Sequence, residues 1–162
     1  MRYNKNNYRW LLAFGLIKKV ILIYLFFNGT IYSQTIEYIN SEIHLSKNYP
    51  FSQATQVNEI LYLSGQIGTN SQGKLVAGGI EAETKQTMLN IKALLESMDL
   101  SLDNVFKCTC MLADISDWPA MSKVYKSFFP TNKLPARSAF AGSGLALGAR
   151  IEIECLATTQ WN

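Results

Sequence analysis

The feature that most restricts the fold of this chain is the order in which strand-like and helix-like periodicities follow one another. Residues 81–98 have apolar or small side chains spaced four, three, four and three apart, which places them on one face of a helix. These side chains are Thr84, Met88, Ile91, Leu95 and Met98. A second helix is predicted after Asp117, which can act as its N-cap, with Pro119 in the first turn. Pro130 ends that helix, whose apolar residues are Met121, Val124, Tyr125 and Phe128.

Strand-like runs surround these two helices. They alternate apolar and polar residues or are rich in β-branched ones, and they cover residues 35–39, 53–57, 60–67, 105–112, 139–141 and 150–158. Asn58 and Glu59 form a connection short enough for a hairpin. Residues 40–50 are polar and predicted as a loop, with His44 on the surface, and residues 68–79 are predicted as an exposed turn region.

The resulting order, β-β-β-α-β-α-β-β, predicts an α+β fold. Two helices among about six strands favour one mixed sheet with both helices packed on one face. No segment is left to cover the other face of the sheet, so self-association is expected there.

Charge is distributed unevenly along the 162 residues. Five of the 15 Lys and Arg residues, and none of the 12 Asp and Glu residues, lie in residues 1–33. Residues 34–162 therefore carry 10 basic and 12 acidic residues, a net charge of −2. A slightly acidic body without a basic cluster argues against a nucleic-acid partner.

Residues 1–33 are predicted to be a signal peptide, and residues 34–162 a single domain. A basic, polar segment at residues 1–10 precedes apolar runs at residues 11–17 and 20–27. A polar segment with small residues follows them. Cleavage near Ser33-Gln34 would export the protein to the periplasm or the extracellular space. An uncleaved membrane anchor is the alternative, but it needs about 20 apolar residues, and that window contains Lys18 and Lys19. A leader without function would leave the protein in the cytoplasm.

Three cysteines are too few for a disulfide framework. Cys108 and Cys110 alternate on a predicted strand and so share a face, which favours two small buried hydrophobic residues over a metal or redox site. A bridge from one of them to Cys155 stays open for an exported protein. No Cys/His spacing indicates a zinc site, and no metal is expected.

Two residues near the end of the chain are candidates for chemistry. Arg137 follows Pro135 at the start of a strand, and Glu152 begins the alternation of the last strand. If these strands are neighbours, the two side chains can face one cavity, where arginine would bind a carboxylate and glutamate would orient or deprotonate water. On the residues alone, a plain ion pair at the surface is the favoured interpretation.

A series of motifs between residues 49 and 154 resembles the RidA/YjgF family of reactive-intermediate deaminases. The motifs lie at residues 49–54, 61–67, 79–84, 90–91, 105–107, 114–118, 124–125, 128–130, 135–138 and 151–154. Each is weak alone, but all of them occur in order and at suitable spacing.

The resemblance implies a chorismate-mutase-like fold and a homotrimer with clefts between its subunits. It implies that Arg137 binds the substrate carboxylate and that Glu152 helps to place the attacking water. The other cleft positions that it implies are Phe51, Ser64, Gly65, Ser116 and Ala139. The implied reaction is hydrolysis of 2-aminoacrylate, its imine tautomer and related 2-imino acids to 2-keto acids and ammonia, with no cofactor.

Three positions depart from the family pattern. Phe51 stands where archetypal members have tyrosine, Ser116 where they often have asparagine, and Ala139 where some have cysteine. These changes affect the expected substrate more than the reaction class. A trimeric protein that binds small carboxylates such as 2-keto acids without turnover is the first alternative. An endoribonuclease is the second, and the acidic body counts against it.

Overall fold

The computed structural model describes residues 35–160, and the predicted signal peptide, its cleavage position and the anchor alternative lie outside them. In chain order the elements are β1 (Ile36–Ile39), α2 (Glu42–Ser46), β2 (Ala54–Val57), β3 (Ile60–Ile67), α3 (Gly79–Glu96), β4 (Val105–Leu112), α4 (Trp118–Lys126), β5 (Ala136–Ala141) and β6 (Ile151–Thr158). The predicted order is confirmed, and α2 is an addition within the segment that was expected to be a loop.

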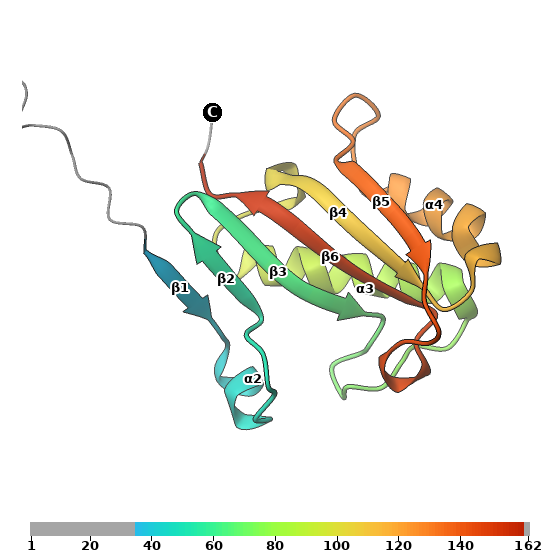
Figure 1. Cartoon of the computed structure of the whole chain (residues 1–162), viewed down its shortest axis with the longest axis horizontal. Coiled ribbons are helices and arrows are strands. Elements are labelled where there is room, and N and C mark those ends of the chain that lie inside the picture. The colour runs from blue at the N-terminus through green and yellow to red at the C-terminus, as the bar shows by residue number, and fades with distance from the viewer. Residues whose placement is uncertain (1–34, 161–162) are drawn as a thin grey trace, which may run out of the picture. The chain divides into compact units, whose positions relative to one another are not determined.

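The six strands form one mixed sheet in the order β1-β2-β3-β6-β4-β5 (Figure 1). All neighbouring pairs are antiparallel except β4 and β5, which are parallel and joined through α4. The hairpin between β2 and β3 pairs Val57 with Ile60, and Asn58 takes a left-handed φ of 54° in its turn. Asparagine tolerates that conformation better than most residues, so the turn forms where the sequence predicts it.

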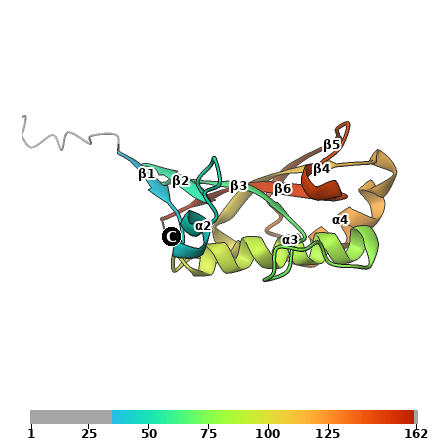
Figure 2. The ribbon, with the colours of Figure 1, turned by 90° about the horizontal axis from the view of Figure 1, so that it is seen from below.

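Helices α3 and α4 lie on one face of the sheet (Figure 2), as predicted. The predicted face of α3 is confirmed, because Thr84, Met88, Ile91 and Leu95 are fully buried and Met98 packs at the edge of the core. Met121 and Tyr125 bring α4 onto the same core. Within residues 35–160, no helix has the length and apolar content needed to cross a membrane.

The face of the sheet away from α3 and α4, here called the open face, has no cover within the described chain. Strand alternation places Tyr38, Tyr62, Leu156 and Phe140 on it, and the exposed fractions of Tyr38, Tyr62 and Phe140 are 69%, 46% and 50%. Exposed aromatic residues on a sheet face are typical of a surface that binds a partner. Self-association through the open face stays a prediction.

The expectation that His44 is a surface residue is wrong. Only 8% of it is exposed, and its Nε2–H donates to the carbonyl oxygen of Phe51 over 2.6 Å. The ring also contacts Tyr49 and Phe51, with centroids 5.0 and 5.3 Å away. The polar sequence around His44 does not reveal this burial, because it comes from residues that α2 and the following turn bring together.

Cys108 and Cys110 share the helix-covered face of β4, as predicted, and both are buried. Cys108 lies opposite Cys155 on the adjacent antiparallel strand β6, with Cα atoms 4.2 Å apart, and the two form a disulfide. Cys110 is a free, buried thiol. Of the two alternatives for these cysteines, the structure contains the disulfide to Cys155. The interpretation as a small buried hydrophobic residue holds for Cys110 alone.

Candidate active site

Glu152 lies over a glycine on the neighbouring strand. Its strand neighbours Ile151 and Ile153 are fully buried under the helices, so alternation directs Glu152 to the open face. The register between β3 and β6 is irregular between Leu63 and Gln66, which brings Gly65 under the carboxylate. A Cβ on Gly65 would lie 2.8 Å from Cδ of Glu152 and closer still to Oε1. The carboxylate occupies the space that a side chain at position 65 would fill.

Hydrogen bonds to the backbone hold Ser64, and ring stacking holds Phe51. Ser64 Oγ donates to the carbonyl oxygen of Ser52 over 2.6 Å, and Ser64 N–H donates to the carbonyl oxygen of Gln53 over 3.0 Å. These bonds join the start of β2 to β3. The ring of Phe51 stacks on that of Tyr49 at 5.5 Å and is half exposed.

A pocket of about 480 Å³ contains three of the predicted site residues, Phe51, Gly65 and Glu152, and is also lined by Lys47 and Leu147. Ser64 and Phe51 line an adjoining pocket of about 580 Å³. Four of the seven predicted site residues therefore lie together in one chain.

The environment of Glu152 makes its carboxyl group a stronger base than usual. Partial burial raises its pKa, and the negative charge of Glu154, two residues along β6, raises it further. A raised pKa brings a carboxylate closer to the range in which it can accept a proton from water.

Arg137 lies on the other side of the sheet. It is paired with the buried Cys108 in the parallel register of β4 and β5, so it points toward α4. Its Nη2 donates to Ser122 Oγ over 3.0 Å, and its guanidinium carbon lies 5.5 and 5.0 Å from the ring centroids of Trp118 and Tyr125. No carboxylate in residues 35–160 forms an ion pair with Arg137. The guanidinium is held in place but its charge is not neutralised.

The expectation that Arg137 and Glu152 face one cavity is wrong within a single chain. Strand β4 separates β5 from β6, and the two side chains project from opposite faces of the sheet. The reason is the strand–helix–strand connection through α4, which makes β5 a parallel neighbour of β4. That connection was visible in the sequence and predicts the β4–β5 pair.

The remaining predicted site residues are Ala139 and Ser116. Ala139 is two residues along β5 from Arg137, on the same face, and packs at the edge of the core. Ser116 lies in the turn that leads into α4, is exposed, and its N–H donates to Asp114 Oδ1 over 2.8 Å. The chain thus holds two separate groups of site residues, one around Glu152 and one formed by Arg137 and Ala139, with Ser116 in the turn before α4.

Two ionisable groups near Arg137 are uncharged at neutral pH. Burial raises the pKa of the Cys110 thiol to about 11, although the charge of Arg137 lowers it. Burial also raises the pKa of Tyr125, against the same charge of Arg137. Neither group offers a nucleophile or a counter-ion, so the guanidinium stays available to an external anion.

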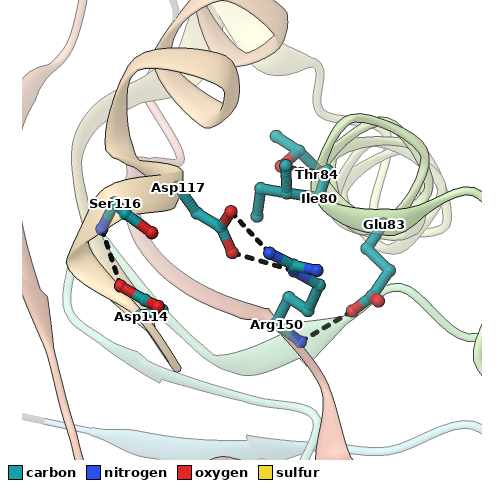
Figure 3. Close-up of polar contacts among 7 residues, drawn as sticks. All are labelled: Ile80, Glu83, Thr84, Asp114, Ser116, Asp117 and Arg150. Carbon is teal, nitrogen blue, oxygen red and sulfur yellow. Dashed lines mark hydrogen bonds and ion pairs between the residues drawn. The ribbon is translucent and has the colours of Figure 1, made fainter.

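An ionic cluster that the sequence did not indicate, between the exposed Arg150 and the buried Glu83 and Asp117, ties the start of β6 to both helices (Figure 3). The guanidinium of Arg150 binds the carboxylate of Asp117 through two hydrogen bonds of 2.9 and 2.7 Å, which raises the pKa of Arg150. The N–H of Arg150 donates to Glu83 over 2.8 Å. Asp117 does precede α4, but its carboxylate binds Arg150 and makes no hydrogen bond to the helix start, contrary to the predicted side-chain cap. The partners are 33 and 67 residues apart, so no local pattern reveals them.

The two groups suit hydrolysis of a substrate that is already electrophilic. One offers a carboxylate base beside an aromatic wall, and the other offers a cation for a carboxylate. Among the described residues, no three His, Cys, Asp or Glu side chains are grouped as a metal site needs.

A family model, curated proteins and solved structures all match most of the described chain. A family model described as Endoribonuclease L-PSP matches residues 42–159. Proteins named 2-iminobutanoate/2-iminopropanoate deaminase from Mus musculus and Homo sapiens are 41% and 43% identical over 109 residues, which are 67% of this chain and 80% and 79% of theirs. The solved structure of the YjgF gene product from E. coli is similar with a TM-score of 0.63 at 30% identity, covering 68% of this chain and 89% of that one.

Proposed function

This chain belongs to the RidA/YjgF family, and from that membership we propose that it hydrolyses 2-imino acids and their enamine tautomers to 2-keto acids and ammonia. The relatives that carry the deaminase name support this reaction class. The single observation that supports it most is that the chain carries both a guanidinium without an ion-pair partner, Arg137, and a carboxylate of raised pKa, Glu152, at the two positions that the family motifs indicate.

The proposed reaction needs few groups. Water adds to the imine carbon, the C–N bond of the resulting carbinolamine breaks, and ammonia and the keto acid leave. Glu152 accepts a proton from the attacking water and returns it toward the nitrogen. Arg137 binds the substrate carboxylate through its planar fork of donors, which fixes the imine carbon near the water. No step requires a cofactor.

The working site is proposed to form between two copies of the chain. Arg137 and Glu152 point away from each other in one copy. A second copy that presented its β5–α4 side to the Glu152 pocket would bring them together. The uncovered open face supports such an association, and closed rotational symmetry of a homotrimer would repeat the site three times. Phe51, Ser64 and Gly65 would then belong to one copy and Ser116 and Ala139 to its neighbour.

Two other functions receive less support. A binder of 2-keto acids would use Arg137 in the same way, and Phe51, which removes a hydroxyl that archetypal members carry in the cleft, favours it. The raised pKa of Glu152 favours catalysis instead. An endoribonuclease, as in the description of the family model, is disfavoured by the net charge of −2 on residues 34–162.

The test couples the purified protein to a pyridoxal-phosphate dehydratase that converts serine or threonine to the enamine. Keto-acid formation is expected to accelerate, and Arg137→Ala should lower kcat/KM by roughly 100- to 1000-fold. Arg150→Ala, the matched loss of an arginine, should cost far less. No acceleration, with 2-keto acids still bound by the intact oligomer, would favour the binding protein.

A further inference from the structure

The pocket that contains Glu152 also contains a cation with no assigned role. Lys47 lines this pocket, and its Nζ lies 5.8 Å from the centroid of the Tyr49 ring. In the part of the chain that the structure describes, no carboxylate, including that of Glu152, lies within ion-pair distance of this ammonium. The pocket thus holds one carboxylate and one separate, unpaired cation.

Hydrogen bonds within α2 and between α2 and the start of β2 fix the backbone position of Lys47. Lys47 is the C-cap of α2, and its N–H donates to the carbonyl oxygen of His44. His44 is itself anchored on Phe51, and Ser41 caps the start of the helix by accepting from His44 N–H. The side chain of Gln53 accepts from Ser41 N–H over 2.6 Å, which ties α2 to the start of β2. These contacts keep the backbone of Lys47 at the pocket wall.

The pocket is larger than a three-carbon imino acid requires. Its volume of about 480 Å³ falls in the range of roughly 300–1000 Å³ that holds drug-sized ligands. Gln53, Gln66 and Asn70 are among the residues that line it, so the additional space offers hydrogen-bonding groups. A longer substrate side chain would therefore meet hydrogen-bonding groups and the charge of Lys47.

We propose that Lys47 determines substrate specificity by binding a second carboxylate, so that the preferred imines derive from dicarboxylic amino acids. This inference rests on the proposed deaminase function. The α-carboxylate would bind Arg137, the imine carbon would face Glu152, and the side-chain carboxylate would reach Lys47. The cation also offsets the repulsion that the Glu152 carboxylate exerts on a doubly negative substrate.

The test compares imines that flavin amino-acid oxidases make in situ from aspartate or glutamate with the imine made from alanine. Semicarbazide competes for each imine, so deaminase activity lowers the yield of semicarbazone. Lys47→Met should reduce the ratio of kcat/KM for the dicarboxylic imine over 2-iminopropanoate by about 10- to 100-fold, the usual effect of one charge-assisted hydrogen bond. Lys47→Arg should restore most of the ratio. Lys85→Met removes an exposed lysine of α3 and should leave the ratio unchanged.

The outcomes separate this inference from the proposed function. Hydrolysis of 2-iminopropanoate with the same ratio in wild type and Lys47→Met would overturn the role of Lys47 alone, whereas no hydrolysis of any imine would overturn the proposed function. A binding titration with 2-oxoglutarate and pyruvate does not depend on turnover. Wild type should bind 2-oxoglutarate more tightly, and Lys47→Met should lose that preference. Equal loss of affinity for both keto acids, or no loss, would contradict the proposal.

Discussion

At the scale of single residues, the site around Glu152 depends on the absence of a side chain at position 65. Gly65→Ala would place a Cβ 2.8 Å from Cδ of Glu152, and the flexible carboxylate would move away. We expect kcat/KM for imine hydrolysis to fall roughly 100-fold, the usual value of a positioned general base. The melting temperature should change little because only a side-chain end is displaced. Unchanged kinetics in this variant would mean that the position of the carboxylate over β3 is not needed.

The acid–base behaviour of Glu152 gives a second prediction. Burial and the charge of Glu154 both raise its pKa, and hydrolysis needs the deprotonated form, so the rate should be lost as pH falls through that raised value. Glu154→Gln removes one of the two causes and should move the acid limb of the kcat/KM profile to lower pH. Glu81→Gln, an exposed change on α3, should leave the limb in place. An acid limb that does not move in Glu154→Gln would show that Glu152 is not the group that titrates.

The residues alone point to Arg137 and Glu152, and the family resemblance adds the other candidate positions, but neither describes their surroundings. Phe51, Ser64, Gly65 and Glu152 do lie together, as the motifs imply. His44 was misjudged because a histidine in a polar stretch gives no local sign that Tyr49 and Phe51 will cover it.

At the scale of secondary-structure elements, Gly68 lets the end of β3 approach the first turns of α3. A Cβ there would lie 2.7 Å from the carbonyl oxygen and 2.8 Å from the Cα of Glu83, which are backbone atoms that cannot rotate away. Gly68→Ala should therefore destabilise the protein by about 1–3 kcal/mol, as measured by urea unfolding. In Gly142→Ala the nearest atom is 4.0 Å away, and this control should unfold at nearly the wild-type urea concentration. Equal stability of both variants would contradict the close approach.

The types of the secondary-structure elements were easier to predict from the sequence than their boundaries. The helical period of α3 and the full length of β4 follow from the sequence, since amphipathic patterns over eight or more residues are distinctive. Strand β5 was predicted only from residue 139, but it starts at Ala136 because parallel pairing with β4 extends it through Arg137. Helix α2 has five residues, too few for a period to appear.

At the scale of the whole molecule, the sheet order could not be read from the order of the strands alone. Periodicity identifies strands but not their neighbours or registers. Strand β4 separates β5 from β6, and the registers place Arg137 and Glu152 on opposite faces. The same order leaves an open face with exposed Tyr38, Tyr62 and Phe140. Both observations support the proposal that the functional unit contains more than one chain.

Subunit mixing shows whether Arg137 and Glu152 from different copies form one site. Arg137→Ala and Glu152→Gln should each be nearly inactive alone. When equal amounts are unfolded and reassembled together, roughly one quarter of the clefts in a randomly assembled trimer combine an intact Arg137 from one copy with an intact Glu152 from its neighbour. If the site is shared, the mixture should recover about that fraction of wild-type imine hydrolysis. A mixture that is no more active than the separate variants, although mixed oligomers have formed, would contradict a site shared between copies.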